Sequence, residues 1–589
     1  MVFSRVKCSA TLHYLILANN IKYLYNVTAM FTREKKFTNK DGSTRIYLQL
    51  AETIRDGDKV RQKIVANLGR LDHLQDEKQI DKLIEGLLPY TKKKELISLL
   101  NHSGSHQEAI KRWDKIWGPV LIYQAIWKEL GLDRILKEYQ SKSRFEFDIN
   151  ASLFAMVLNR LVDPDSKSGV HHWIQGVYEP SFASLSLQHF YRGLDFLAEH
   201  KEPLENELFT QLQKLYAIPL HIVFWDTTST YFEGEGPESL AKFGFSKDNR
   251  SDRVQIVIGL LVTEEGIPLA HEIFPGNLHD TKSMLQAFAI LKERFQVKKI
   301  ILVGDRGMVS NAFLSSLDEQ GYEYIVGMKM RKLKHMQRIL RSEEPWETVE
   351  PIETVRDTTL TLRTSEKEVI QKRSPLQVQE VFFQYKRYVI CLNPQEASYD
   401  QTTREIVVQK LQEKLNEGGV KSLIANAAYK RFVKVEGTRA QIDQEVISAE
   451  ALYDGKYILH TNNQTLSAKE IALNYKHLWR VERSFRELKS TLDLRPIFHW
   501  SEPRVRGHVM VCVLSYLLES LLRKKLKDQN IDCCFKELMK DLQQIQASLL
   551  VYPDGRERIV RAELPGQSYL AFQALKITPP VLSKEVSTT

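Results

Sequence analysis

The sequence predicts a mixed α/β protein, in which an α/β core is interrupted by a β-rich insertion. A mostly helical N-terminal region and a helical C-terminal region flank the core. Between residues 219 and 330, short apolar runs typical of strands come first, and amphipathic helical patterns separate the later runs. Residues 331–465 show the alternation of apolar and polar side chains that strands produce. Helical periodicity dominates residues 107–218 and returns after residue 501.

A chain of 589 residues is too long for a single hydrophobic core, so we expect several domains. Residues 1–29, which we expect to be an over-long start, precede these patterns. The patterns divide the rest of the chain into a β-hairpin followed by a helix (30–100), a helical region (107–218), the first part of the core (219–330), the β-rich insertion (331–465), a helix that completes the core (466–500) and the C-terminal helical region (501–589). The Asp56-Gly57 pair supports the hairpin, because this dipeptide favours a tight turn between antiparallel strands.

The order of elements in the core points to one type of sheet. We expect strands at 221–226, 254–262, 268–274, 299–303 and 322–328, and helices at 280–295 and 311–320. The second and third strands form a hairpin, and the helices between the later strands predict crossovers. This is the order of a ribonuclease-H-like core, in which the first and fourth strands are neighbours.

Composition narrows the class of protein. The 83 basic and 74 acidic side chains give a formal charge of +9, a mild excess that suits a polyanionic partner. The five cysteines show no metal-ligand spacing, and such a sparse, odd number predicts a reducing cytoplasm. No apolar stretch reaches transmembrane length without polar interruption, so we expect no membrane association.

Three acidic residues, far apart in the sequence, end or occupy elements that can carry them into one cleft. Asp226 closes an apolar run, Asp305 closes a second one, and Glu482 lies on a helical pattern. An aspartate that ends a single buried strand usually only begins a turn, but neighbouring strands would bring these two together. Close carboxylates repel unless a cation lies between them, and hard divalent cations prefer oxygen ligands. The three acids therefore predict a metal site of the kind that clamps a phosphodiester.

The helical pattern around Glu482 has two faces. Tyr475, Glu482 and Lys489 recur at intervals of seven residues, close to two helical turns, and would form one stripe. An apolar stripe runs about 60° away from it and consists of Leu478, Val481, Phe485, Leu488 and Leu492. We expect the helix to bury the apolar stripe and to present Glu482 at the margin of the cleft.

Three segments carry a resemblance to a known family: residues 225–232 (Trp-Asp-Thr-Thr-Ser-Thr-Tyr-Phe), 304–307 (Gly-Asp-Arg-Gly) and 475–489. In these segments the chain resembles the DDE transposases of bacterial insertion sequences, in the group with a Tyr-Arg-Glu-Lys helix motif and a β-rich insertion before the catalytic glutamate. The resemblance implies that the three acids are catalytic and hold two Mg²⁺ (or Mn²⁺) ions. It also implies cleavage of phosphodiester bonds at the ends of the element and strand transfer into target DNA.

The resemblance further implies that Tyr475 and Lys489 contact the DNA phosphate near the cleaved end. The arginine of the family motif, three residues after the tyrosine, is replaced by Leu478. Arg480 and Arg486 are nearby alternatives, and Arg486 lies one turn after the glutamate.

Other basic residues are candidate DNA contacts. Arg306 follows the second catalytic aspartate directly and is a candidate for phosphate contact. Lys247 and Arg250 belong to a loop that resembles one common in these transposases, and we expect both to face DNA.

The partners follow from the same resemblance. They are double-stranded DNA, as terminal inverted repeats and as target, and a second copy of the chain in a homodimeric synaptic complex. Residues 107–218 would help to bind the terminal repeats, and the protein would act in the bacterial cytoplasm at the nucleoid.

Three other classes of protein fit the sequence less well. A ribonuclease-H-like nuclease that cuts without joining needs neither the large insertion nor the long N-terminal region. A catalytically retired DNA-binding derivative has no need for three intact acids. A tyrosine recombinase requires an Arg- and His-rich constellation that this sequence lacks.

Overall fold

The structure, a computed structural model, describes residues 30–39, 44–56, 59–76, 79–80, 82–83, 109–143, 145–217, 222–278, 294–295, 301–304, 310–331, 335–349, 375–416, 431–436 and 439–585. The predicted start at 1–29 and most of the predicted helix at 280–295 lie outside these residues. The chain separates into two compact units, Met1–Glu108 and Ala109–Thr589, and each is described by itself.

The first unit is a small antiparallel sheet with the order β1-β2-β3, followed by a short helix. Its elements are β1 (Met30–Thr38), β2 (Thr44–Asp56), β3 (Lys59–Arg70) and α2 (Leu71–Asp76). The predicted hairpin between β2 and β3 is present, and its last pair is Asp56↔Lys59, so Asp56 belongs to the strand and the connection is one residue later than an Asp56-Gly57 turn predicts. Ala51 is fully buried and Leu74 is 8% exposed, so the unit has a small core between sheet and helix.

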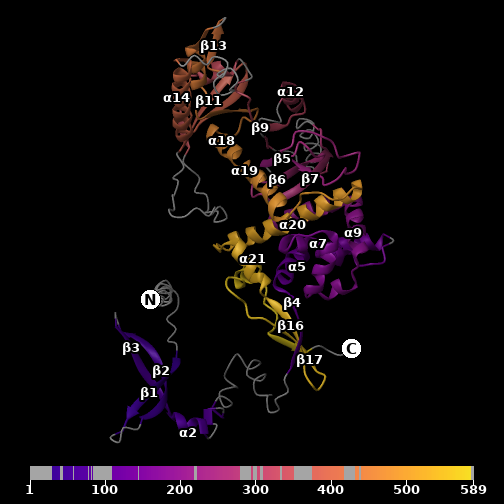
Figure 1. The fold of residues 1–589 in the computed structure, drawn as a ribbon, viewed down its shortest axis with the longest axis vertical. Coiled ribbons are helices and arrows are strands. Elements are labelled where there is room, and N and C mark those ends of the chain that lie inside the picture. Colours follow the sequence, from indigo (N-terminus) through magenta and orange to yellow (C-terminus); the bar gives the residue numbers. More distant parts are fainter. Residues whose placement is uncertain are drawn as a thin grey trace. The chain divides into compact units, whose positions relative to one another are not determined.

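The second unit is organised around a nine-stranded sheet with the order β10-β11-β12-β15-β9-β8-β5-β6-β7 (Figure 1). The five strands that form one end of this sheet are β5 (Ile222–Tyr231), β6 (Gln255–Thr263), β7 (Pro268–Pro275), β8 (Ile301–Gly304) and β9 (Glu323–Gly327). Strand β6 is antiparallel to both β5 and β7, whereas β8 is parallel to both β5 and β9. Helix α12 (Asn311–Glu319) links the parallel strands β8 and β9. This is the ribonuclease-H-like order, and the predicted mixed α/β class is confirmed.

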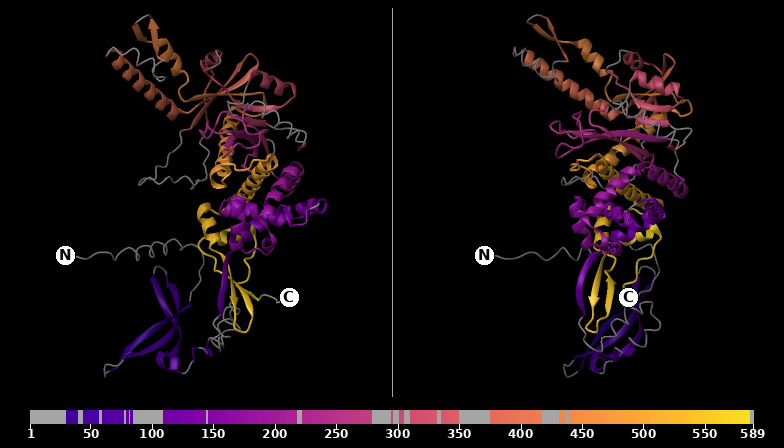
Figure 2. Two further views of the ribbon diagram at one scale, coloured as in Figure 1. Left: turned by 45° about the vertical axis from the view of Figure 1, so that its right-hand side comes forward. Right: turned by 90° about the vertical axis from the view of Figure 1, so that its right-hand side faces the viewer.

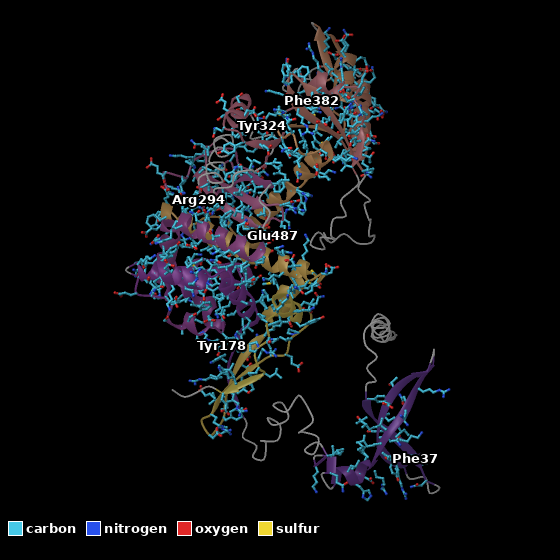
Figure 3. All side chains as sticks on the ribbon, turned by 180° about the vertical axis from the view of Figure 1, so that it is seen from behind. Phe37, Tyr178, Arg294, Tyr324, Phe382 and Glu487 are labelled. Atoms are coloured by element: carbon cyan, nitrogen blue, oxygen red, sulfur yellow. The ribbon has the colours of Figure 1, made fainter. Side chains whose placement is uncertain are left out.

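The segment between β9 and the helix that carries Glu482 extends the same sheet. Its elements are α13 (Met336–Leu340), β10 (Glu347–Val349), β11 (Leu376–Phe383), β12 (Lys386–Leu392), α14 (Pro394–Asn416), β13 (Val433–Glu436), β14 (Arg439–Ile442), α17 (Gln444–Ala451) and β15 (Lys456–Thr461). Strand β15 pairs antiparallel with β9, and the buried Tyr324 hydroxyl lies 3.2 Å from Nε2 of His460 across that junction (Figure 3). The β-rich segment is therefore joined to the core by hydrogen bonds of the sheet itself.

Helices cover the sheet and form a bundle beside it. They are α5 (Gly118–Glu129), α6 (Leu132–Ser141), α7 (Ile149–Val162), α8 (Lys167–Trp173), η2 (Ile174–Gly176), η3 (Pro180–Ser184), α9 (Leu187–Glu199), α10 (Lys201–Tyr216), α18 (Ala468–Lys476), α19 (Trp479–Arg486), η7 (Glu487–Thr491), α20 (Glu502–Asp528), α21 (Phe535–Gln543) and α22 (Tyr569–Leu575). Helix α20 lies between the sheet and the helices α5, α7 and α9 (Figure 1). Among the described residues, α20 alone is long and apolar enough to span a membrane, but it is mostly buried as the central helix of this unit.

The helical C-terminal region extends as predicted into the 540s, to Gln543, but the described residues 544–585 are not helical throughout and contain only the short helix α22. Strands β16 (Gln546–Val551), β17 (Glu557–Arg561) and β18 (Ser583–Glu585) follow, and β16 pairs with β4 (Ile110–Ile116) from the start of the unit (Figure 2). The physical reason is a partner more than four hundred residues away, which supplies hydrogen bonds to β16 that local periodicity does not reveal.

Trp225 fixes the position of β5 in the core. Its indole ring is fully buried and packs over Gly259 of β6. Gly259 itself pairs with Thr227 of β5. A Cβ atom at position 259 would overlap the ring, so the close approach of strand and side chain requires glycine there.

We predict that Gly259→Ala lowers the free energy of unfolding by about 1–3 kcal/mol, because overpacking forces the buried ring or the strand to shift. Thermal or urea unfolding measures the change. Gly176→Ala is the matched control, since no atom lies within 4 Å of a Cβ placed there. Equal stability of the two variants would contradict the packing described for Trp225.

Candidate active site

Asp226 lies in the middle of β5 and not at the end of a strand, which corrects the sequence-based prediction. The strand continues to Tyr231, and Asp226 pairs with Leu260 of β6. The apolar run ends at Trp225, but the strand itself continues. Its remaining residues are mostly small and polar, and their backbone still pairs with β6. On the other side of β5, the pairing with the described residues of β8 ends at Phe224↔Val303, two residues before Asp226.

Strand alternation decides which way Asp226 faces. Val223 and Trp225 belong to the apolar cluster that includes the bundle helices, whereas Ile222 and Phe224 belong to the cluster that includes α19 and η7. Successive side chains of a strand point to opposite faces, so Asp226 shares its face with Phe224. The carboxylate therefore lies on the face of the sheet that α19 covers.

Glu482 reaches the same region from α19. The predicted apolar stripe is confirmed, because all five of its residues are buried in the cluster beneath α19 and η7. Glu482 follows the fully buried Val481 and is itself exposed. Burial of the stripe thus turns the neighbouring Glu482 side chain toward solvent.

The helix that carries Glu482 is not continuous, which corrects the single stripe predicted for residues 475–489. Helix α18 ends at Lys476 and α19 begins at Trp479; the last turn, Glu487–Thr491, is π-helical. Backbone hydrogen bonds from Leu478 to Tyr475 and from Val481 to Leu478 span three residues and mark the break. Tyr475 is therefore out of line with Glu482 and stacks on Tyr457, with 5.7 Å between ring centroids.

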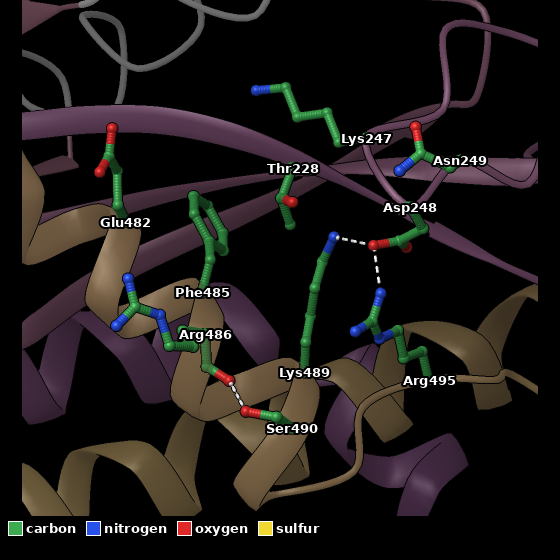
Figure 4. Close-up of a pocket in the computed structure, with 10 residues that line it drawn as sticks. All are labelled: Thr228, Lys247, Asp248, Asn249, Glu482, Phe485, Arg486, Lys489, Ser490 and Arg495. Carbon is green, nitrogen blue, oxygen red and sulfur yellow. Dashed lines mark hydrogen bonds and ion pairs between the residues drawn. The ribbon is translucent and has the colours of Figure 1, made fainter. Parts of the chain in front are cut away.

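A pocket of about 470 Å³ opens between β5, the 247–249 loop and the α19–η7 segment (Figure 4). It is lined by Thr228, Lys247, Asp248, Asn249, Glu482, Phe485, Arg486, Lys489, Ser490 and Arg495. Lys489 donates to Oδ1 of Asp248 over 2.8 Å, and Arg495 donates to the same oxygen. The side chains of Lys489 and Asp248 are only 10% and 4% exposed, so their ion pair is buried.

Burial acts on the charge of Lys489. Removal from water lowers the pKa of the Lys489 ammonium group below the ordinary lysine value, and the hydrogen bond to Asp248 opposes that shift. Nearby Arg495 and Lys247 lower the pKa further, because like charges disfavour the protonated form.

Lys247 reaches toward the proposed metal ligand. Its ammonium nitrogen lies 2.5 Å from the carbonyl oxygen of Thr227 and 3.7 Å from Oδ1 of Asp226. The same carboxylate oxygen accepts the backbone N–H of Thr227. Lys247 thus places a positive charge beside the Asp226 carboxylate. Carboxylate oxygens such as those of Asp226 and Glu482 are ligands that suit Mg²⁺.

The other predicted residues are placed differently. Arg486 is exposed and lines the pocket. Arg250 is absent from the pocket lining; it forms two hydrogen bonds with Asp252 and lies over the Tyr231 ring, with 4.8 Å to the centroid. Asp305 and Arg306 lie outside the described residues, and β8 ends at the residue before Asp305. Among the residues that are described, no three His, Cys, Asp or Glu side chains form a group able to hold a metal.

Sequence reasoning missed Asp248 and Arg495 as pocket residues. Asp248 stands in a polar loop between the basic residues Lys247 and Arg250, and no local pattern marks it as a partner of Lys489. Arg495 lies beyond the helical pattern, in the segment that follows η7, so helical periodicity carried no signal for it.

Two family models match the chain. The model of the transposase DDE domain matches residues 222–518, and the model of the N-terminal domain of IS1634 family transposases matches residues 32–95. The first match alone covers half of the chain. The protein therefore belongs to the DDE transposases, and the N-terminal match places it among those of insertion sequences.

Comparison with solved structures adds two similar transposases. The piggyBac transposase, in a synaptic complex with hairpin DNA, is 11% identical, with a TM-score of 0.34 over 74% of this chain and 82% of that one. The Mos1 transposase, in a paired-end complex with the left transposon end, is 12% identical, with a TM-score of 0.14 over 31% of this chain and 58% of that one. No curated protein matches the chain.

We predict that Leu478→Ala lowers the free energy of unfolding by about 2–5 kcal/mol, because the side chain is 6% exposed and packs in the cluster beneath α19. Urea unfolding measures the loss. Trp479→Ala, at a neighbouring side chain that is 41% exposed, is the control and should have a smaller effect.

Leu478→Arg should unfold more easily still, because it buries an unpaired guanidinium group. If this variant instead kept wild-type stability and bound element ends more tightly, position 478 would face DNA and the assignment to the buried stripe would be wrong.

Proposed function

We propose that this transposase cleaves phosphodiester bonds at the ends of its element and transfers the freed strand into target DNA. The observation that carries the proposal is the convergence on one region of two acids from separate elements. Asp226 lies on the face of β5 that α19 covers, and Glu482 of α19 lines the adjoining pocket. Basic side chains of the same pocket suit a polyanionic substrate.

We propose that Asp226, Asp305 and Glu482 would hold two Mg²⁺ or Mn²⁺ ions. When bound, the ions would activate water or a 3′-hydroxyl group and stabilise the leaving oxygen. The protein contributes the fixed positions of the ligands. Asp226 is held by its pairing with Leu260 of β6, the preceding residues of β5 pair with β8 as well, and Lys247 lies close enough to balance the charge of the carboxylate.

Lys489, Arg486 and Lys247 are the proposed phosphate contacts inside the pocket, since all three line it. Arg250 and Tyr475 lie outside the lining, so DNA would have to extend beyond the pocket to reach them. Arg306 completes the proposed contacts.

The proposed organisation follows the predicted boundaries. Residues 107–218 recognise terminal repeats, residues 219–330 and 466–500 form the catalytic core, and residues 331–465 and 501–589 are accessory. Double-stranded DNA and a second copy of the chain are the proposed partners in a synaptic complex, in the bacterial cytoplasm.

We predict that Asp226→Asn, Asp305→Asn and Glu482→Gln each abolish metal-dependent cleavage of terminal-repeat DNA while leaving DNA binding intact. Removing one carboxylate charge leaves the ions without a full ligand set. Nicking assays and gel shifts measure the two properties. Asp554→Asn is the control, because Asp554 is exposed and pairs with Arg556 outside the pocket. Wild-type nicking by any triad variant would exclude that residue from the metal site.

A second prediction concerns the ions. Mg²⁺ and Mn²⁺ should support both cleavage and strand transfer, whereas Ca²⁺ should support assembly on DNA with little chemistry, because its looser coordination misplaces the reacting oxygens. Assays that follow the joined product also separate a transposase from a nuclease that only cuts. Efficient cleavage in EDTA would rule out the metal mechanism.

A further inference from the structure

Two cations of the pocket share a single acceptor. Oδ1 of Asp248 accepts hydrogen bonds from both Lys489 and Arg495, as Figure 4 shows. Within the described part of the chain, the other oxygen of this carboxylate is buried without a hydrogen-bond partner. The ammonium group can donate three hydrogen bonds and the guanidinium group five. One carboxylate oxygen therefore holds two strong donors side by side without using up their capacity.

Arg495 is held in place from both directions along the chain. Before it, Leu494 donates its backbone N–H to Leu488 of the η7 turn; after it, Ile497 donates to the Tyr231 carbonyl at the end of β5. Glu233 returns a bond to Ile497. The backbone around Arg495 thus bridges the helix that carries Lys489 and the strand that carries Asp226.

Asp248 is tethered to the same strand. The residue before it, Lys247, donates its backbone N–H to Oγ of Ser229 over 2.8 Å, and its side chain reaches the Thr227 carbonyl. Hydrogen bonds to β5 therefore fix the positions of both Asp248 and Arg495 relative to that strand.

The charges of the pocket favour an anion. The lining includes four basic side chains, Lys247, Arg486, Lys489 and Arg495, against the two acidic side chains of Asp248 and Glu482. A phosphate group can accept a planar pair of hydrogen bonds from a guanidinium group and a further one from an ammonium group.

We propose that Arg495 is a second phosphate-binding residue beside Lys489, and that Asp248 is a positioning residue that holds both side chains ready for one phosphate group at the cleaved end of the element. The inference rests on the proposed function. Arginine keeps its charge under all relevant conditions, whereas burial lowers the pKa of Lys489. Arg495 thus secures the positive charge of the pair, and Asp248 compensates it while no DNA is bound.

The test measures binding of the full-length protein, in EDTA, to two terminal-repeat duplexes that differ only in a 5′-phosphate or 5′-hydroxyl group at the cleaved end. Wild type should prefer the phosphorylated end. Arg495→Ala and Lys489→Ala should each reduce this preference about tenfold, the size of one charge-assisted hydrogen bond. Each should also lower the slope of log affinity against log salt by about one unit.

Asp248→Asn should behave differently, because both cations remain. It should reduce the preference for the phosphorylated end while leaving the salt slope unchanged, which loss of a cation would not do. Arg506→Ala is the control, since Arg506 pairs with Glu502 outside the pocket, and it should keep the wild-type preference.

Wild-type preference and slope in folded Arg495→Ala would overturn the proposal. If that variant does not fold, the double variant Asp248→Asn/Arg495→Gln removes both charges of this ion pair together and gives the same decision. Glu482→Gln should keep the phosphate preference without cleavage. Absence of end binding by wild type would refute the proposed function itself, whereas binding without phosphate preference would refute only this inference.

Discussion

The site depends on the register of strand β5. Side chains alternate across the strand, so a shift of one residue would move Asp226 to the bundle face and Trp225 to the pocket face. Pairing with β6 along nine residues and parallel pairing with β8 oppose such a shift. The fit of the Trp225 ring over Gly259 adds a steric lock, because only one register places the ring where no Cβ stands in the way.

Packing of α19 on that sheet sets the second half of the site. Burial of the stripe that begins at Leu478 and Val481 fixes the rotation of the helix about its axis. Glu482 is therefore directed away from the apolar cluster and toward solvent. Because the helix is broken after Lys476, α18 and α19 can face different directions. Tyr475 of α18 stacks on Tyr457 of β15, whereas Glu482 of α19 lines the pocket.

Electrostatics then shape what the pocket accepts. Lys489 is buried at a cost in desolvation, and its ion pair with Asp248 offsets part of that cost. Lys247 lies beside Asp226, where its positive charge compensates the charge of the carboxylate. Lys489 and Arg495 are thus balanced by Asp248, and Asp226 is balanced by Lys247, so these five charged groups form two compensated sets on neighbouring elements.

The sequence by itself determined the mixed α/β class, the order of the core strands, the buried stripe of the Glu482 helix and the transposase family. These depend on local periodicity and on short motifs, which are visible within a few residues. Tertiary structure alone decided that Asp226 lies in mid-strand, that β16 pairs with β4, and that Asp248 holds Lys489 and Arg495. Asp248 and Lys489 are 241 residues apart, and such pairs form only when packing of the whole unit offsets the entropy of ordering the chain between them.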